Sequence, residues 1–196
     1  MSILFIATSY YGVTQTFNYG IKVGANYSKF LEEKELFSTN RKPFIVGGFH
    51  SKINWGNKIG TRSELVFSQA GASYDAYDIR LNRIAMPIYV TYPLLKKLTL
   101  GVGGEVSKVN SVTSRNIQTS ISGVIENSFK SIDYGWIVNL EYSILSNASI
   151  DFRYYQGLLF HNEISIAASF RSPIIEVYRI DKVSLFSVAI NYFFKK

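Results

Sequence analysis

The residues from Asp133 to Ile144, DYGWIVNLEYSI, alternate strictly between two sets of side chains. One set is Tyr134, Trp136, Val138, Leu140, Tyr142 and Ile144, and the other is Asp133, Gly135, Ile137, Asn139, Glu141 and Ser143. A period of two predicts a β-strand whose faces meet different environments. An inward apolar face would indicate a soluble barrel or sandwich. An outward apolar face would mean that lipid surrounds the protein.

Eight segments of the chain show this alternation. They are residues Asn18–Phe30, Phe44–Asn54, Lys58–Gln69, Ile79–Tyr92, Leu98–Lys108, Ser131–Ile144, Ala148–Gly157 and Lys182–Phe194. The connections near Asn54, Pro93 and Ser143 are tight, and those at Leu31–Pro43, Ala70–Asp78, Val109–Lys130 and Leu158–Asp181 are long. In an up-and-down barrel, this order puts every tight turn at one end. Transmembrane barrels typically have short periplasmic turns and longer extracellular loops.

The apolar face of the eight segments carries no charged residue, whereas the opposite face carries acids, bases and many glycines. We expect a lumenal charge network of Lys22, Arg62, Glu64, Arg83, Glu105, Asp133, Glu141, Asp151 and Arg153, with Lys52 and His50 on the same side. A charge at the bilayer midplane costs about 2–4 kcal/mol, so a lipid face should lack charges. A narrow bore needs small residues and paired charges. The sequence therefore predicts that the apolar face points outward.

Aromatic residues on the apolar face gather near the strand ends. We expect a girdle of Tyr19, Tyr92, Tyr142, Tyr192 and Phe194 at the tight-turn end, and a girdle of Tyr27, Phe49, Phe67, Tyr134, Tyr154 and Phe186 at the long-loop end. Aliphatic and small residues lie between them. Two aromatic girdles around an aliphatic band are typical of membrane barrels. The predicted fold is an all-β, eight-stranded, antiparallel, up-and-down transmembrane β-barrel.

Composition narrows the class of protein. The chain has no cysteine, which excludes disulfides and thiolate metal sites, and no apolar run long enough for a transmembrane helix. Its 21 Lys and Arg against 14 Asp and Glu are scattered rather than clustered, which argues against nucleic-acid binding. We expect residues 1–15 to be the back part of a secretory signal and residues 16–196 to form the barrel. An N-terminal strand is the alternative.

Several stretches, in order and spacing, resemble the small outer-membrane β-barrel family of Bacteroidota, known as PorT-like or outer membrane protein beta-barrel domain proteins. They are NYGIKVGANYSKF, SELVFSQAGAS, LNRIAMPIYVTY, LTLGVGGEV, DYGWIVNLEY and IDFRYYQGL. The resemblance covers nearly all of Asn18–Phe194. It implies an eight-stranded barrel in the bacterial outer membrane, and the name PorT suggests a link to secretion. The final Lys195 and Lys196 depart from the usual terminal aromatic residue.

No motif predicts catalysis or a cofactor. The glycines of GVGGEV lie within a strand rather than before a helix, and His50 and His161 have neither the partners of a nucleophilic triad nor the spacing of metal ligands. We expect a non-enzymatic outer-membrane protein with a plugged polar lumen and a loop-mediated envelope, adhesion or accessory role. Its expected partners are membrane lipid and lipopolysaccharide. Residues 109–130 and 158–181 are candidates for contact with another envelope protein, and residues 158–181 could instead form a hairpin extension of the last two strands. A secretion-type assembly subunit and a soluble lipocalin-like carrier remain alternatives.

Overall fold

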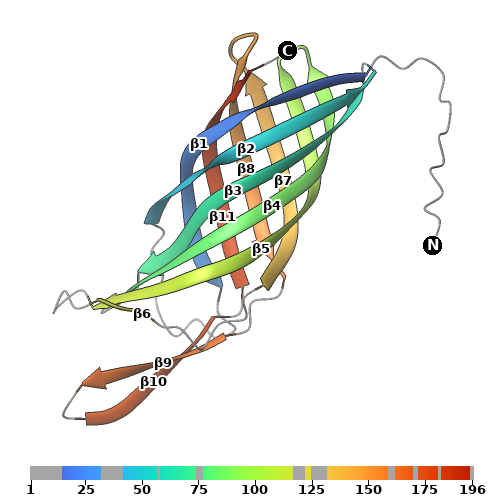
Figure 1. Ribbon diagram of the computed structural model, residues 1–196. Coiled ribbons are helices and arrows are strands. Elements are labelled where there is room, and N and C mark those ends of the chain that lie inside the picture. The colour runs from blue at the N-terminus through green and yellow to red at the C-terminus, as the bar shows by residue number, and fades with distance from the viewer. Residues whose placement is uncertain are drawn as a thin grey trace, which may run out of the picture.

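The computed structural model is dominated by one closed antiparallel β-barrel (Figure 1). It describes residues 15–31, 42–56, 58–73, 77–116, 122–124, 132–158, 162–169, 172–180 and 182–194. The barrel strands are β1 (Gln15–Leu31), β2 (Lys42–Trp55), β3 (Ile59–Ser73), β4 (Tyr77–Leu95), β5 (Leu98–Asn116), β7 (Ile132–Ser143), β8 (Ala148–Gly157) and β11 (Lys182–Phe193). The short β6 (Ser122–Val124) pairs with β5, and β9 (Asn162–Ser169) and β10 (Ser172–Ile180) form a separate two-stranded sheet.

The barrel closes through the pairing of β1 with β11, so no edge of the eight-stranded sheet is left open. Across that pairing Tyr27 lies opposite Phe186. Following the register from Phe186 the other way round the barrel reaches β1 at Phe17, ten residues away. The intermediate partners are Tyr154, Val138, Val102, Val90, Thr61 and Ile53. A displacement of this size on eight strands corresponds to a strand tilt of about 40°, the usual value for membrane barrels.

The tight connections all lie at one end of the barrel. Residues 56–58, 96–97 and 144–147 join β2 to β3, β4 to β5 and β7 to β8. Gly56 has a φ of 67°, a left-handed conformation that glycine adopts without a steric penalty. We call this end the tight-turn end and the other the long-loop end. Figure 1 shows the tight-turn end together with the C-terminus at the top, and the β9–β10 hairpin beyond the long-loop end.

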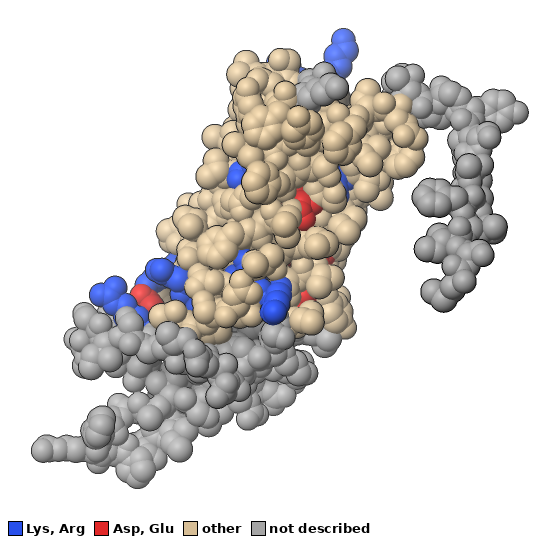
Figure 2. Space-filling view, viewed as in Figure 1, with Lys and Arg blue, Asp and Glu red and all other residues tan. Residues whose placement is uncertain are grey.

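The apolar side chains point out of the barrel, and the charged side chains point into it. Trp136, Ile88 and Val102 are 41%, 52% and 55% exposed, whereas Glu141 and Arg62 are 3% and 0% exposed. A barrel dissolved in water would show the opposite distribution. The prediction of an outward apolar face is therefore confirmed, and the lipocalin-like alternative is wrong. Figure 2 shows a barrel wall with few charged atoms, and Lys and Arg gathered near the long-loop end.

Two predicted long loops are shorter than expected. β3 and β4 stay paired as far as Ser73 and Asp78, which leaves only residues 74–76 between these strands, and β5 continues to Asn116. The interior of this extension is apolar, because Ala70, Ala72, Ile79, Leu81, Val109 and Val112 form one buried cluster with Tyr89, Ile137, Tyr155, Val183 and Leu185. Burial of these side chains supports the strands beyond the predicted ends. Residues 158–181 include the antiparallel hairpin of β9 and β10, which follows β8 and leads into β11, in line with the predicted hairpin extension, although the two strands form a sheet of their own.

The register also corrects one member of the predicted aromatic girdles. Phe49 pairs with Ile21 and Leu65 in the middle of the sheet, whereas Tyr27 at the long-loop end pairs with Pro43. The predicted place of Phe49 at the long-loop end is wrong because β2 begins at Lys42, seven residues before it. The side chain of Phe49 is 66% exposed, within the aliphatic band.

A charge in the aliphatic band should destabilise the barrel much more than one at its end. Ile88→Arg places a guanidinium near mid-strand and should cost about 2–4 kcal/mol, whereas Leu94→Arg, beyond Tyr92 on the same face, should cost about 0–1 kcal/mol. Urea unfolding in phospholipid bilayers measures both free energies. Equal losses in the two variants would contradict the assignment of the lipid face.

Candidate functional site in the bore

Six charged side chains meet in the middle of the bore. The cations are Lys22, Arg62 and Arg153, and the anions are Glu64, Glu141 and Asp151. We call this set the middle cluster. They come from β1, β3, β7 and β8, on strand positions whose neighbours point to the outer face. Their side chains are at most 5% exposed, so each charge depends on its protein partners rather than on water.

Glu64 is the hub of the middle cluster. Its carboxylate lies 2.8 Å from Nε of Arg62, 3.2 Å from Nζ of Lys22 and 2.6 Å from Nη2 of Arg153. The hydroxyl of Tyr89 donates a hydrogen bond of 2.8 Å to the same carboxylate. β3 and β8 are on opposite sides of the eight-stranded barrel, so the pair between Glu64 and Arg153 spans the full width of the bore.

The other two acids are held in the same way. Asp151 lies 2.8 Å from Nζ of Lys22 and accepts a hydrogen bond from Asn139. Glu141 lies 3.0 Å from Nη1 of Arg62 and accepts a hydrogen bond of 2.9 Å from Ser149. Each carboxylate therefore has at least one cation and one neutral donor. Charges in a low-dielectric interior are tolerated when they are paired and hydrogen-bonded in this manner.

Tyr89 is a member of this site that was not predicted from the sequence. Its ring lies near the guanidinium groups of Arg153 and Arg62, with centroid distances of 5.6 and 5.9 Å. The ring needs the empty space over Gly101, because a Cβ there would lie 2.6 Å from Cδ2 of Tyr89. Tyr89 alternates with Ile88 and Val90, which are outward, so the period of two could have placed it in the bore.

A second group of charges, the upper cluster, lies closer to the long-loop end. Arg83 Nη2 is 2.6 Å from Glu105 Oε1, and Arg83 Nη1 is 3.8 Å from Asp133 Oδ2. Tyr155 donates a hydrogen bond of 2.7 Å to Asp133, and its ring lies 5.1 Å from the Arg83 guanidinium carbon. The structure thus divides the nine residues of the predicted network between two clusters. The six members of the middle cluster are in mutual contact, and the remaining three form the upper one.

The aromatic residues of the tight-turn girdle, Tyr19, Tyr92, Tyr142, Tyr192 and Phe194, are all exposed on the outer face. Phe17 and Trp55 are also exposed at this end. They were not predicted, because the first strand was expected to begin at Asn18 and the second to end at Asn54, whereas β1 begins at Gln15 and β2 ends at Trp55. At the long-loop end, Tyr27, Phe67, Tyr134 and Phe186 are exposed, and Tyr154 is half-buried against Trp136, which the sequence analysis did not include.

The structure provides no catalytic or metal-binding constellation among the residues that it describes. His50 is buried beside Phe193, and neither of its ring nitrogens has a hydrogen-bond partner there. Within the same residues, no three His, Asp or Glu side chains gather in a way that could hold a metal ion. His161 and residues 1–14, the greater part of the predicted signal, lie outside the described residues. The described part of the chain also has no helix long and apolar enough to cross a membrane.

Comparisons with solved structures show the same fold at low sequence identity. Neisserial surface protein A is 11% identical, with a TM-score of 0.53, and the match covers 91% of this chain and 98% of that one. The Yersinia pestis attachment invasion locus protein Ail, solved with the heparin analogue sucrose octasulfate, is 14% identical with a TM-score of 0.53 and covers 91% and 99% of the two chains. A search of curated protein sequences finds no match.

A family model supplies the assignment that these distant structures cannot give. The model described as "Outer membrane protein beta-barrel domain" matches residues 13–159, which is most of the chain. The matched part includes β1 to β5, β7 and β8, and with them every member of both charge clusters. The chain therefore belongs to the outer membrane protein β-barrel domain family, and its place is the bacterial outer membrane.

Proposed function

We propose that this protein is a non-enzymatic outer-membrane barrel whose bore is plugged by ion pairs and which acts through its long-loop end. The observation that carries the proposal is the contact of 2.6 Å between Arg153 and Glu64 across the full width of the bore. In a barrel of eight strands the interior is just wide enough for side chains to fill. A direct contact between opposite walls leaves no continuous aqueous path at that level.

The plug is a static network rather than a relay for protons or ions. Glu64 is fixed by three cations and Tyr89, and these partners come from β1, β3, β4 and β8. Moving one ion through the network would require several of these pairs to break together. Each break would leave a charge buried without a partner, at a cost of several kcal/mol. The apolar cluster above it, which includes Leu81 and Ile79, adds a second closed layer.

The proposed lack of an enzymatic role is consistent with the surroundings of the described histidine. A nucleophilic site needs a hydroxyl, an imidazole and a carboxylate that hydrogen-bond in series. Among the described residues, His50 makes no such hydrogen bond to Ser, Thr, Asp or Glu. The carboxylates nearest the middle of the bore are held in ion pairs and are not open to a substrate.

The long-loop end carries a collar of basic side chains on its outer face. It consists of Lys29, Arg80, Lys108, Arg115 and Lys182, just beyond the long-loop girdle. Lys42 at the same end is already paired with Asp78 at 2.5 Å. In an outer membrane this level is that of the anionic groups of lipopolysaccharide, and each basic residue near an anionic lipid surface contributes about 1 kcal/mol. We propose that the collar binds these lipid phosphates.

A second candidate function is that of a subunit in a larger envelope assembly, in line with the resemblance to PorT-like proteins of Bacteroidota. The observation that favours it is the β9–β10 hairpin, which is a separate two-stranded sheet. An isolated hairpin of two strands is marginally stable in water. Contact with a partner protein would stabilise it. Purification in mild detergent separates the candidates, because a stoichiometric partner favours the assembly and its absence favours the solitary barrel.

Glu64→Ala should destabilise the barrel without opening it. The substitution leaves Lys22, Arg62 and Arg153 with too few anions and should cost about 3–5 kcal/mol. Heat-modifiability gels and urea unfolding report the stability, and recordings in planar bilayers report conductance. The guanidinium groups and Tyr89 remain in the bore, so both the variant and the parent protein should show no large conductance step.

Lys58→Gln is the matched control, because Lys58 is exposed and has no ion-pair partner among the described residues. It should change neither stability nor conductance. A steady open-channel current in the parent protein, or a large step in the Glu64→Ala variant, would refute the plug.

Substitution of two collar residues should reduce the rise in unfolding temperature that anionic lipid causes. In nanodiscs of zwitterionic phospholipid, addition of lipid A should raise the unfolding temperature of the parent protein. The double variant Lys108→Gln, Arg115→Gln should lose most of that increase, because two phosphate contacts are removed. The variant Lys96→Gln, Lys97→Gln at the tight-turn end is the control and should keep it. An equal increase in all three proteins would show that the collar does not bind lipid A.

A further inference from the structure

The charges in the bore balance in number but not in position. The middle cluster has three cations and three anions and is neutral by itself. The upper cluster has one cation, Arg83, and two acids, Glu105 and Asp133. Lys52 belongs to neither cluster and lies on the tight-turn side of the middle cluster. The bore therefore has a surplus of positive charge near its tight-turn mouth, which in outer-membrane barrels faces the periplasm.

Lys52 has only a weak partner. Within 4 Å, the one carboxylate that meets its ammonium group among the described residues is that of Glu141, at 3.5 Å. The same oxygen of Glu141 already lies 3.0 Å from Arg62, and the other oxygen accepts the hydrogen bond from Ser149. A distance of 3.5 Å is longer than a normal charge-assisted hydrogen bond of about 2.7–2.9 Å. Glu141 is therefore paired mainly with Arg62, and most of the positive charge of Lys52 is not compensated by a carboxylate.

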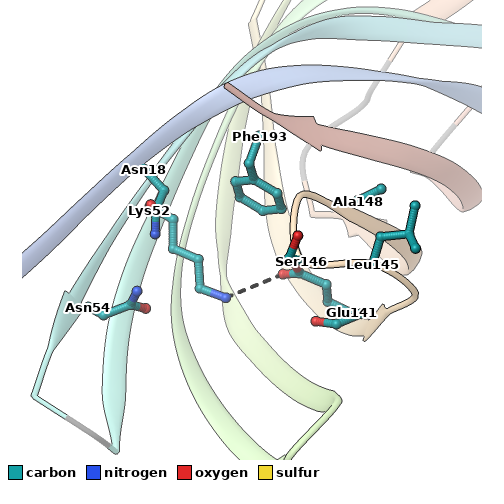
Figure 3. Close-up of a pocket in the computed structure, with 9 residues that line it drawn as sticks. Asn18, Lys52, Asn54, Glu141, Leu145, Ser146, Ala148 and Phe193 are labelled. Carbon is teal, nitrogen blue, oxygen red and sulfur yellow. Dashed lines mark ion pairs between the residues drawn. The ribbon is translucent and has the colours of Figure 1, made fainter. Parts of the chain in front are cut away.

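The ammonium group of Lys52 lies in an open vestibule rather than in packed protein. Two cavities of about 80 and 320 Å³ share Lys52 and Asn54 in their walls, and we call them together the vestibule. Figure 3 shows the residues that line the smaller cavity. Lys58, Thr16, Thr91 and Thr99 are among the residues that line the larger cavity. Glu141 is the one acid among the described residues that line the vestibule. The side chain of Lys52 is 14% exposed, so a ligand can reach it.

Asn18 provides an independent sign of a ligand site. Its side chain lines the smaller cavity, it is 7% exposed, and its Oδ1 has no hydrogen-bond partner. A buried amide without a partner is costly, so such a group commonly belongs to a binding site. The oxygen and nitrogen of an asparagine amide exchange places by a simple rotation. Asn18 can therefore turn its NH₂ group toward an acceptor held by Lys52.

We propose that the vestibule binds a small oxyanion, a carboxylate or phosphate group of a periplasmic solute, with Lys52 as its main contact. Lys58 adds long-range attraction, and Asn18 and Asn54 provide neutral polar groups around the anion. The larger cavity is at the lower end of the size range of small-molecule sites. A neutral ligand would leave the Lys52 charge uncompensated and is disfavoured. This inference goes beyond the proposed function, because it holds whether or not the long-loop end binds lipid.

A nuclear magnetic resonance titration tests the site. The ¹⁵N-labelled barrel in zwitterionic micelles is titrated with inorganic phosphate and, separately, with acetate, at constant ionic strength against sodium chloride. The backbone amides of Asn54 and Gly60, which line the vestibule, should shift saturably at millimolar concentrations of either oxyanion. A response to phosphate alone would identify the ligand as a phosphate compound, and a response to acetate alone would identify it as a carboxylate. Both results support the site.

Three variants decide whether Lys52 is the contact. Lys52→Gln should weaken the affinity by about tenfold, equivalent to about 1.4 kcal/mol, whereas Lys52→Arg keeps the charge and should retain binding. Lys97→Gln lies at the same end outside the vestibule and should bind as the parent protein does. Glu141 keeps Arg62 and Ser149 in the Lys52→Gln variant, so the barrel should fold normally on a heat-modifiability gel. Shifts that match those in chloride, or binding that Lys52→Gln leaves unchanged, would overturn the proposal.

Discussion

The ion pair between Glu64 and Arg153 joins opposite walls of the barrel, and the arrangement of the remaining charges follows from it. Arg153 reaches across the bore, Tyr89 lies under its guanidinium group, and Gly101 leaves the space that Tyr89 occupies. Lys22 and Arg62 complete the shell of Glu64 and extend it to Asp151 and Glu141. A barrel of this width can hold such a network only because the apolar side chains are on the outside.

The outward placement of the apolar side chains also explains why the strands are longer than the membrane requires. Within the membrane, the outer face is solvated by lipid and the inner face by ion pairs. Beyond the long-loop girdle, lipid no longer solvates the outer face, and the interior changes from charged to apolar. β3, β4 and β5 can therefore continue outside the membrane as a small conventional core. The charged interior and the apolar interior meet at the upper cluster, where Tyr155 contacts both Arg83 and the apolar side chains.

The strands and their faces could be predicted from the sequence because lipid imposes a strict rule on one face of each strand. Charged residues are excluded from that face, so residues such as Trp136 and Glu141 show which face of the strand points outward and which points into the bore. Strand ends beyond the membrane follow no such rule, and Ala70 and Ala72 were consequently expected in a loop. Phe49 was misplaced because an aromatic residue fits both the girdles and the lipid-facing band between them.

The partition of the charges along the bore could not be predicted in the same way. Pairing across the barrel depends on register and tilt, which the alternation of a single strand does not contain. The equal number of acids and bases was visible, but the isolation of Lys52 from the middle cluster required the contacts of Glu141 with Arg62 and Ser149. The charge surplus at the tight-turn mouth is therefore a property of the three-dimensional structure.

The most direct test of the inverted barrel is a cysteine scan of β7 with nitroxide labels in lipid bilayers, since the chain has no cysteine of its own. Collisions with oxygen, which concentrates in lipid, are compared with collisions with a water-soluble nickel complex. We expect oxygen maxima with a period of two at Tyr134, Trp136, Val138 and Leu140, and minima at Gly135, Ile137, Asn139 and Glu141. Oxygen maxima at the second set, or no period of two, would contradict it.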